Sequence, residues 1–343
     1  MTVYVVSVGL SLKHALAEPG RTLRSDEGLL QAVGVARPHE LLASAGIGNL
    51  ESDRARASEW VATALADPGS AQGRTLRDTA RDIRPGDWPP RMSAELDTLS
   101  RLLDRSFALE GGDIAVLVCS DTADGLLAGV WNAVAIAGGD ISRVRYVPDL
   151  DVPFSAELKK SLRGSVVIAR ITDLDVREKQ FGDAMRGLGL LARRLFASGA
   201  LERKEEFRFV LSGGFKASIP YLIGLAEIVR SVDDECLHDI GVPELTPVAE
   251  PYPVTAWVQH EDADPDARPI RLPLRRLIAE AARQEVSGYD ERGKRTTPLG
   301  STLLDGYAYD VKKKFGGKRE YVLTPFGEGL RAFLGSTHDR PGS

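Results

Sequence analysis

Residues 212–218 (SGGFKAS) place two glycines and a lysine directly after the apolar run 207–211. Glycine lets backbone N–H groups approach a ligand with no Cβ in the way, and N–H groups at a helix N-terminus favour anions. Lys216 adds a full positive charge. Gly213, Gly214 and Lys216 therefore predict a phosphate site. The alternative is a plain strand-to-helix turn with a surface lysine.

A second turn, residues 8–12 (VGLSL), closes the β-branched run that starts the chain. A serine just past a buried strand can hydrogen-bond a phosphate or ribose oxygen, so Ser7 and Ser11 are candidate ligand contacts. A serine in this position can also cap a helix, and for this turn taken alone capping is the favoured interpretation.

A third turn contains Ser120, Asp121 and Thr122, which follow the apolar run 114–119. Two hydroxyls and a carboxylate are suited to ribose hydroxyls or to the edge of a base. The same residue types form turns that cap helices, and taken alone this turn favours capping.

Apolar runs that predict strands alternate with segments that predict helices. Strands are expected at 2–9, 114–119, 144–150, 165–173 and 207–211, and helices at 91–107, 125–139, 178–199 and 217–229. This alternation predicts an α/β fold with a doubly wound, mainly parallel, Rossmann-like sheet. Because ligands bind beyond the carboxyl ends of the strands in such sheets, the three turns are expected to face one rim.

The chain is expected to contain two domains. Residues 1–245 form the Rossmann-like domain, with a helical insertion at about 34–90. Helices are expected at 274–286 and 301–315, and a short strand with a closing helix in 316–334. Residues 246–343 are therefore expected to form a small winged-helix-like α+β domain with a flexible tail.

Composition narrows the classes of function. The 343 residues carry a formal net charge of −5, which argues against broad non-specific nucleic-acid binding. Cys119 and Cys236 lack zinc spacing and the five histidines are scattered, so no metal and no cofactor are predicted. Neither a GxxxxGK[ST] loop nor a GxGxxG turn after a strand is present. No membrane helix and no signal peptide are recognised, so a cytoplasmic location is expected.

The three turns and one helix occur in an order that resembles the CRISPR-associated Rossmann-fold (CARF) domains. The matching segments are 8–12 (VGLSL), 93–99 (SAELDTL), 120–125 (SDTADG) and 213–222 (GGFKASIPYL). The resemblance covers about residues 1–245, and its most specific element is Gly-Gly-Phe-Lys-Ala. The chain has Leu10 where the family often has threonine.

This resemblance implies a homodimer that binds a cyclic oligoadenylate, the second messenger of type III CRISPR defence, across its two-fold axis. A ring of four adenylates is favoured over six, and a two-fold site suits an even ring. The implied ligand contacts are Gly9, Leu10, Ser11, Ser120, Asp121, Thr122, Ser212, Gly213, Gly214, Phe215 and Lys216.

The resemblance also implies a ring nuclease that destroys the messenger without a metal. A ribose 2′-hydroxyl would attack the adjacent phosphate in line and leave a 2′,3′-cyclic phosphate. Such an enzyme must fix that geometry and stabilise charge on the phosphoryl oxygens. The expected catalytic residues are Lys216 for charge stabilisation and Ser11 for orientation.

Two alternative functions would depend on the C-terminal part of the chain. An effector ribonuclease would need an Arg–His pair, and Arg331 and His338 have a matching spacing, although His338 lies in a polar tail. A ligand-controlled transcription regulator would contact DNA through a basic segment, Lys312, Lys313, Lys314, Lys318 and Arg319. The acidic chain does not favour DNA binding, and a solvated charged face explains this segment equally well.

Overall fold

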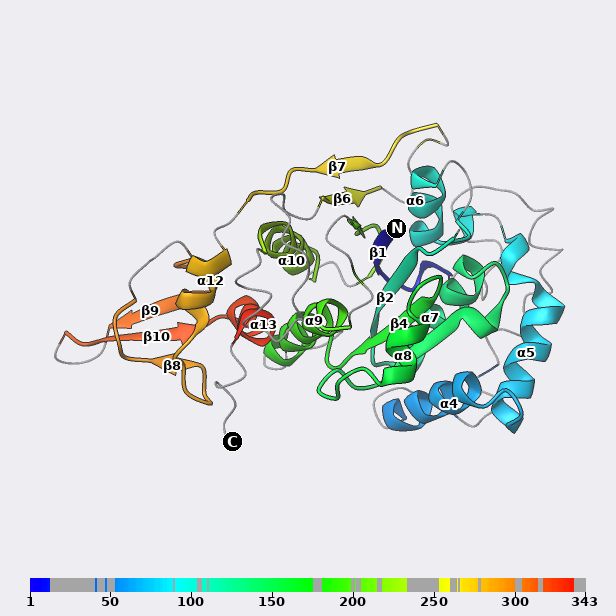
Figure 1. The fold of residues 1–343 in the computed structure, drawn as a ribbon, viewed down its shortest axis with the longest axis horizontal. Coiled ribbons are helices and arrows are strands. Elements are labelled where there is room, and N and C mark those ends of the chain that lie inside the picture. Colours follow the sequence, from blue (N-terminus) through cyan, green and yellow to red (C-terminus); the bar gives the residue numbers. More distant parts are fainter. Residues whose placement is uncertain are drawn as a thin grey trace.

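In the computed structural model of this protein, the described residues are 1–12, 41, 47, 53–88, 90–103, 107–109, 111–174, 181–198, 201, 205–214, 218–232, 253–259, 264, 266–276, 279–299, 304–313 and 317–335. A seven-stranded sheet forms the centre of the molecule (Figure 1). Its strands are β1 (Thr2–Ser7), β2 (Ile114–Ser120), β3 (Val144–Val147), β4 (Val166–Ile171), β5 (Glu206–Val210), β6 (Val254–Val258) and β7 (Ile270–Leu272).

The strand order is β3-β4-β2-β1-β5-β6-β7. Neighbouring strands from β3 to β6 are parallel, and β7 runs antiparallel to β6. The predicted α/β fold with a mainly parallel sheet is therefore confirmed, and it is consistent with a Rossmann-like arrangement. Strands buried on both faces need continuous apolar runs, and β1 and β2 provide them.

The order of the sheet reverses at β1. The chain builds β2, β3 and β4 on one side of β1 and then places β5 and β6 on the other side. In open α/β sheets, ligands bind beyond the carboxyl ends of the strands at such a switch point. The three predicted turns follow β2, β1 and β5, which are direct neighbours, so they lie at one edge of the sheet.

Helices cover both faces of the sheet. They are α4 (Arg54–Ala66), α5 (Ala71–Ile83), α6 (Ala94–Leu102), α7 (Ala123–Ile136), α8 (Ala156–Ser161), α9 (Phe181–Phe196) and α10 (Ile219–Ser231), with 3-10 turns η2 (Pro85–Asp87), η3 (Pro90–Met92) and η4 (Ile141–Arg143). Figure 1 shows α9 and α10 on one side of the strands and α4 to α7 on the other. The helices α4 and α5 lie within the predicted insertion.

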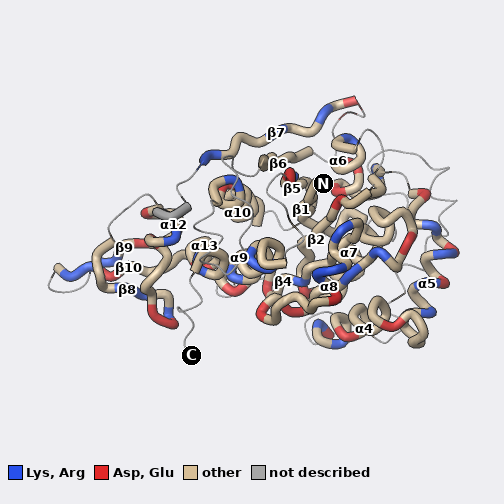
Figure 2. Tube along the Cα trace, in the orientation of Figure 1, with Lys and Arg blue, Asp and Glu red and all other residues tan. Residues whose placement is uncertain are grey.

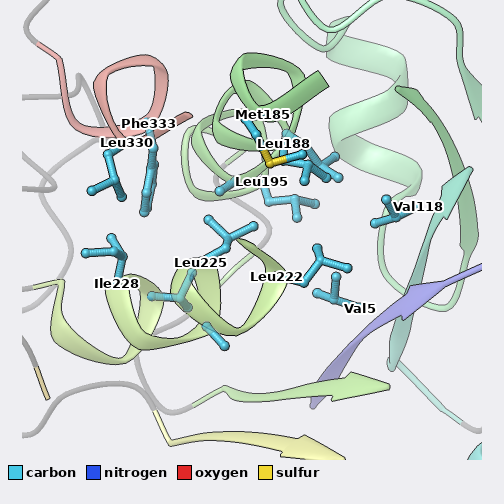
Figure 3. Packing of buried hydrophobic residues seen from close by; sticks show 14 of the residues in the cluster. Val5, Val118, Met185, Leu188, Leu195, Leu222, Leu225, Ile228, Leu330 and Phe333 are labelled. Atoms are coloured by element: carbon cyan, nitrogen blue, oxygen red, sulfur yellow. The ribbon is translucent and has the colours of Figure 1, made fainter. Parts of the chain in front are cut away.

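Alternate strand residues build two cores. Val5 and Val118 face α9 and α10, where they join Met185, Leu188 and Leu222 (Figure 3). Their chain neighbours point the other way, into the core beneath α4 to α7. Burial of each such side chain contributes about 1.5–3 kcal/mol to the stability of the fold, so packing on both faces holds the sheet in position.

A second, three-stranded antiparallel sheet lies at the far end of the molecule (Figure 1). The elements of this part are α12 (Ala279–Val286), β8 (Lys294–Arg295), β9 (Tyr309–Lys313), β10 (Arg319–Leu323) and α13 (Pro325–Leu334). Helix α13 packs closely on α9: a Cβ added to Gly189 would lie 1.9 Å from the carbonyl oxygen of Gly329. Phe333 and Leu330 thereby join the core beneath α9 and α10.

The predicted helix over 301–315 is wrong. Residues 309–313 form the strand β9, which pairs with β10. Tyr309 is fully buried and packs edge-on against Tyr321 of β10, so tertiary contacts override the local helix pattern. The turn between the strands includes Gly317, whose φ of +78° favours glycine.

The first sheet also continues past residue 245, because β6 and β7 belong to it. The predicted boundary at 245 therefore does not coincide with the end of the sheet, and the division into two domains stays a prediction. Among the described residues, no helix combines the length and apolar character that crossing a membrane requires.

Candidate functional site at the carboxyl edge of the sheet

The first and last predicted turns touch each other. The Ser7 hydroxyl at the end of β1 donates to the Gly213 carbonyl at 2.6 Å and lies 3.3 Å from the Val210 carbonyl. Ser7 is buried, whereas Gly213 is partly exposed. The turn after β1 and the turn after β5 thus form one connected structure at the switch point.

Two glycines make this approach feasible. A Cβ added to Gly9 would lie 2.6 Å from the backbone nitrogen of Gly214, a distance that real Cβ atoms do not tolerate. Gly214 itself has a φ of +91°, a conformation that other residues rarely adopt. Glycine at these positions therefore follows from close backbone packing at the edge.

The centre of the site is Glu95, which the sequence did not single out. Ser93 is the N-cap of α6, and its hydroxyl accepts from the Leu96 N–H at 3.2 Å. Glu95 follows in the first helical turn, where the helix dipole favours a carboxylate. Its side chain is fully buried. The serine cap with an acidic first turn, inside the segment 93–99, was the signal that could have found it.

The Glu95 carboxylate binds donors from both the first turn and its own helix. Oε1 accepts from the Gly9 N–H. Oε2 accepts from the Ser11 hydroxyl at 3.0 Å and lies 2.5 Å from the Ser93 hydroxyl. The Ser11 oxygen also lies 3.3 Å from the Ala94 nitrogen, so Ser11 contacts the start of α6. Gly9 and Ser11, predicted to contact the ligand, here contact a carboxylate of the chain itself.

Gly213 is adapted to the same carboxylate. A Cβ at this position would lie 1.9 Å from Glu95 Oε1, so a larger residue would displace Glu95. Ser212 is held from another direction: its oxygen accepts from the Gln259 N–H at 2.9 Å and from the Thr98 hydroxyl at 2.6 Å. Gln259 and Thr98 are further residues of this edge that the sequence did not single out.

The turn after β2 has a different environment. Ser120 and Thr122 are hydrogen-bonded at 2.9 Å, and Thr122 caps α7 by accepting from the Gly125 N–H at 3.0 Å. The capping interpretation of this turn is confirmed. Asp121 is buried and paired with arginines, at 2.6 Å to Arg54 of α4 and 3.7 Å to Arg170 of β4.

The remaining predicted residues are placed as follows. Leu10 is 39 % exposed at the rim. Phe215 and Lys216 lie outside the described residues, as do Cys236, Lys314 and His338. Arg331 donates to the Asp290 and Tyr289 carbonyls, at 3.1 and 3.3 Å.

Burial changes the protonation chemistry beneath the site. Burial, aided by the nearby Glu95 charge, raises the pKa of the Cys119 thiol far above its usual value, so this thiol is an inert core group. Burial also raises the pKa of Tyr146 to about 12, although the hydrogen bond between Ser58 and Tyr146 opposes the shift. Within the described ranges, no group of His, Cys, Asp and Glu side chains is arranged to hold a metal ion.

Comparison with known proteins finds no protein-family model that matches the chain and no match among curated proteins.

Proposed function

We propose that the chain binds a cyclic oligoadenylate of type III CRISPR defence at this edge, as a homodimer of CARF type, with cyclic tetra-adenylate favoured. The observation that carries the proposal is the junction of the first and last turns at the switch point, through Ser7 and Gly213. Parallel α/β sheets bind nucleotides at such a place.

The exposure of the predicted contacts supports this proposal. The described contacts other than Asp121 are partly or fully exposed: Gly9, Leu10, Ser11, Ser120, Thr122, Ser212, Gly213 and Gly214. A ring of phosphates and adenines can therefore reach hydroxyl groups from three neighbouring turns. Leu10 adds an exposed apolar side chain at the rim that a second copy of the chain would cover.

Ring cleavage is the second part of the proposal. Lys216 would stabilise the charge on the phosphoryl oxygens, and Ser11 would orient the attacking 2′-hydroxyl. The Ser11 hydroxyl is suited to this task because Glu95 and the start of α6 hold it in one orientation. The reaction needs no oxidant and no bound group beyond the ring itself.

The test is incubation of the purified protein with cyclic tetra-adenylate and cyclic hexa-adenylate in EDTA, followed by liquid chromatography and mass spectrometry. We expect linear products ending in 2′,3′-cyclic phosphate, and a rate lower by about 10²-fold in Lys216→Ala, because one charge-stabilising group is lost. Lys318→Ala, which removes an exposed lysine directly before β10, is the matched control. If the ring stays intact and co-elutes with the protein, the protein binds the ring as a sensor and does not cleave it. A protein that neither binds nor cleaves either ring would refute the proposal.

A second candidate, a ligand-controlled DNA-binding regulator, is favoured by one observation. The hairpin of β9 and β10 exposes Lys312, Lys313, Lys318 and Arg319. Figure 2 shows basic residues at this end of the molecule, away from the sheet edge described above. Lys313 and Arg319 are direct cross-strand partners, and like charges in this arrangement destabilise a hairpin unless an anion lies nearby.

In this second candidate the small sheet with α12 and α13 acts as a winged-helix-like module. The test is fluorescence anisotropy with duplex DNA from the protein's own promoter, at several salt concentrations. DNA binding by a phosphate-contacting hairpin should weaken steeply with salt, and it should weaken further in Lys313→Ala. Salt-independent or absent binding would exclude this candidate.

A further inference from the structure

In the chemistry proposed so far, the buried Glu95 carboxylate only holds the Ser11 hydroxyl in place. Among the described residues, its hydrogen-bond donors are the Gly9 amide and the Ser11 and Ser93 hydroxyls, which are uncharged. Ser11 is partly exposed, whereas Glu95 is fully buried. Ser11 therefore connects a buried carboxylate to the rim where the ligand is proposed to bind.

The hydrogen-bond network around Glu95 has one more acceptor than it has protons to donate. Ser93 has a single hydroxyl proton but two acceptors in reach, Glu95 Oε2 at 2.5 Å and Asn132 Oδ1 at 2.9 Å. The orientation of Asn132 is set because its Nδ2 donates to the Ala128 carbonyl at 3.0 Å. A hydroxyl donates only one hydrogen bond.

Two arrangements of protons are compatible with these distances without moving a heavy atom, and only the second fills both Ser93 contacts. When Glu95 is ionised, Ser93 donates to Glu95. When Glu95 is protonated, it donates to Ser93, and Ser93 donates to Asn132 Oδ1. The row Ser11–Glu95–Ser93–Asn132 can therefore accept a proton at the Ser11 end and accommodate it in the core.

We propose that Glu95 takes up the proton that the ribose 2′-hydroxyl loses during ring opening, with Ser11 as the link. This inference rests on the proposed ring cleavage. The 2′-hydroxyl gives its proton to the Ser11 oxygen while the Ser11 proton passes to Glu95 Oε2. The 2′-oxygen forms its bond to phosphorus, the bond from phosphorus to the 5′-oxygen breaks, and the 5′-oxygen takes a proton from water. The hydroxide left behind is neutralised when Glu95 returns its proton to the solvent through Ser11.

The neighbouring carboxylates are less suited to this role. Asp121 is paired with Arg54 and Arg170, and no described contact joins it to Ser11. Asp97 is held by Arg101 at 3.0 Å and by the Gln259 side-chain amide at 2.8 Å. Among these three acids, Glu95 is the one that the described contacts connect to a predicted catalytic hydroxyl.

The experiment measures the single-turnover rate of cyclic tetra-adenylate cleavage and, separately, the dissociation constant of the ring, in EDTA. The variants are Glu95→Gln, which keeps the shape, and Glu95→Asp, which keeps the acid. General base catalysis contributes about 10²–10⁴-fold, so we expect Glu95→Gln to cleave at least about 10²-fold more slowly with unchanged ring binding. Glu95→Asp should be faster than Glu95→Gln.

The matched control is Glu227→Gln, which removes another buried carboxylate, on α10, whose partner is Arg275. It should leave the cleavage rate unchanged. If Glu95→Gln is as fast as Glu95→Asp or faster, only shape matters and the inference is overturned. Equal loss of rate and binding in Glu95→Gln also overturns it.

Ser93→Gly is a second variant in case Glu95→Gln does not fold. Glycine is tolerated at an N-cap, so α6 should persist while the Ser93 hydroxyl is lost. We expect a rate about tenfold lower, with Ser11 and Glu95 in place. An unchanged rate in a folded Ser93→Gly protein refutes the inference. A wild-type protein that leaves the ring intact refutes ring cleavage itself. A wild-type protein and a Glu95→Gln variant that cleave the ring equally fast refute only the role of Glu95.

Discussion

Two buried carboxylates lie at the same edge of the sheet and are held in different ways. Asp121, after β2, contacts the guanidinium groups of Arg54 and Arg170. Glu95, at the start of α6, contacts an amide and two hydroxyls. The first region is an ion-pair cluster whose charges compensate one another, and the second is a hydrogen-bond network around one acid.

This difference indicates that the Asp121 region has a structural role and the Glu95 region a chemical one. The guanidinium groups of Arg54 and Arg170 compensate the charge of Asp121 and tie α4 to the sheet, so this acid serves the structure. Hydroxyl groups can both donate and accept, so the surroundings of Glu95 tolerate either protonation state. The Asp121 region should therefore determine stability more than the Glu95 region does.

The largest effect is expected for Asp121→Asn. The loss of the Asp121 charge leaves Arg54 and Arg170 close together, with Asp173, 3.7 Å from Arg54, as the remaining counter-charge, and this should lower the free energy of unfolding by about 3 kcal/mol. Glu95→Gln keeps an acceptor for the Gly9 N–H and should cost about 1 kcal/mol. Urea denaturation of both variants makes the comparison. Equal losses would contradict the assignment of Asp121 as the structural centre.

Gly213→Ala tests the packing of the Glu95 region. The new Cβ would lie 1.9 Å from Glu95 Oε1, so the carboxylate must move away from its donors. We expect a loss of about 2 kcal/mol in urea denaturation, as for other overpacked sites. Gly112→Ala is the control, because no atom lies within 4 Å of the added Cβ. If Gly213→Ala is no more destabilising than this control, the close contact with Glu95 is wrong.

The pH dependence of stability that Tyr146 causes tests the packing of the Asp121 region. Its pKa is raised from 10.0 to about 12, mainly by burial, so the folded state holds the phenol proton more tightly than the unfolded state does. The contribution to stability is complete below pH 10 and is lost as the pH rises through about 12. Near pH 11 this loss reaches about 1 kcal/mol relative to pH 9. Tyr146→Phe should lack this part of the alkaline decline, and parallel curves for the two proteins would contradict the shift.

A small effect, similar to that of Glu95→Gln, is expected for Ser7→Ala. The variant removes the hydrogen bond from β1 to the Gly213 carbonyl, which should cost about 1 kcal/mol. Thr75→Ala on α5 removes an exposed hydroxyl-to-carbonyl hydrogen bond and should change stability by less than about 0.5 kcal/mol. Thermal unfolding of both variants compares a buried with an exposed hydroxyl. A loss no greater than that of the control would mean that the junction of the turns does not depend on Ser7.

Much of the first sheet could be predicted from local patterns. Continuous apolar runs such as 114–119 mark buried parallel strands, and their alternation with helices indicates the α/β class. The segment 301–315 could not be predicted, because burial of Tyr309 against Tyr321 decides its strand. The place of β6 and β7 in the first sheet likewise depends on pairing between distant residues.

The sequence by itself determined the type of fold and the edge at which the three turns gather. The reason is that strand periodicity and turn chemistry are local properties that short segments carry. Only the tertiary structure decided what fills that edge. Glu95 reaches Gly9 and Ser11 across more than 80 residues of chain, and Arg54 reaches Asp121 across 67, so these contacts exist only once the helices pack on the sheet.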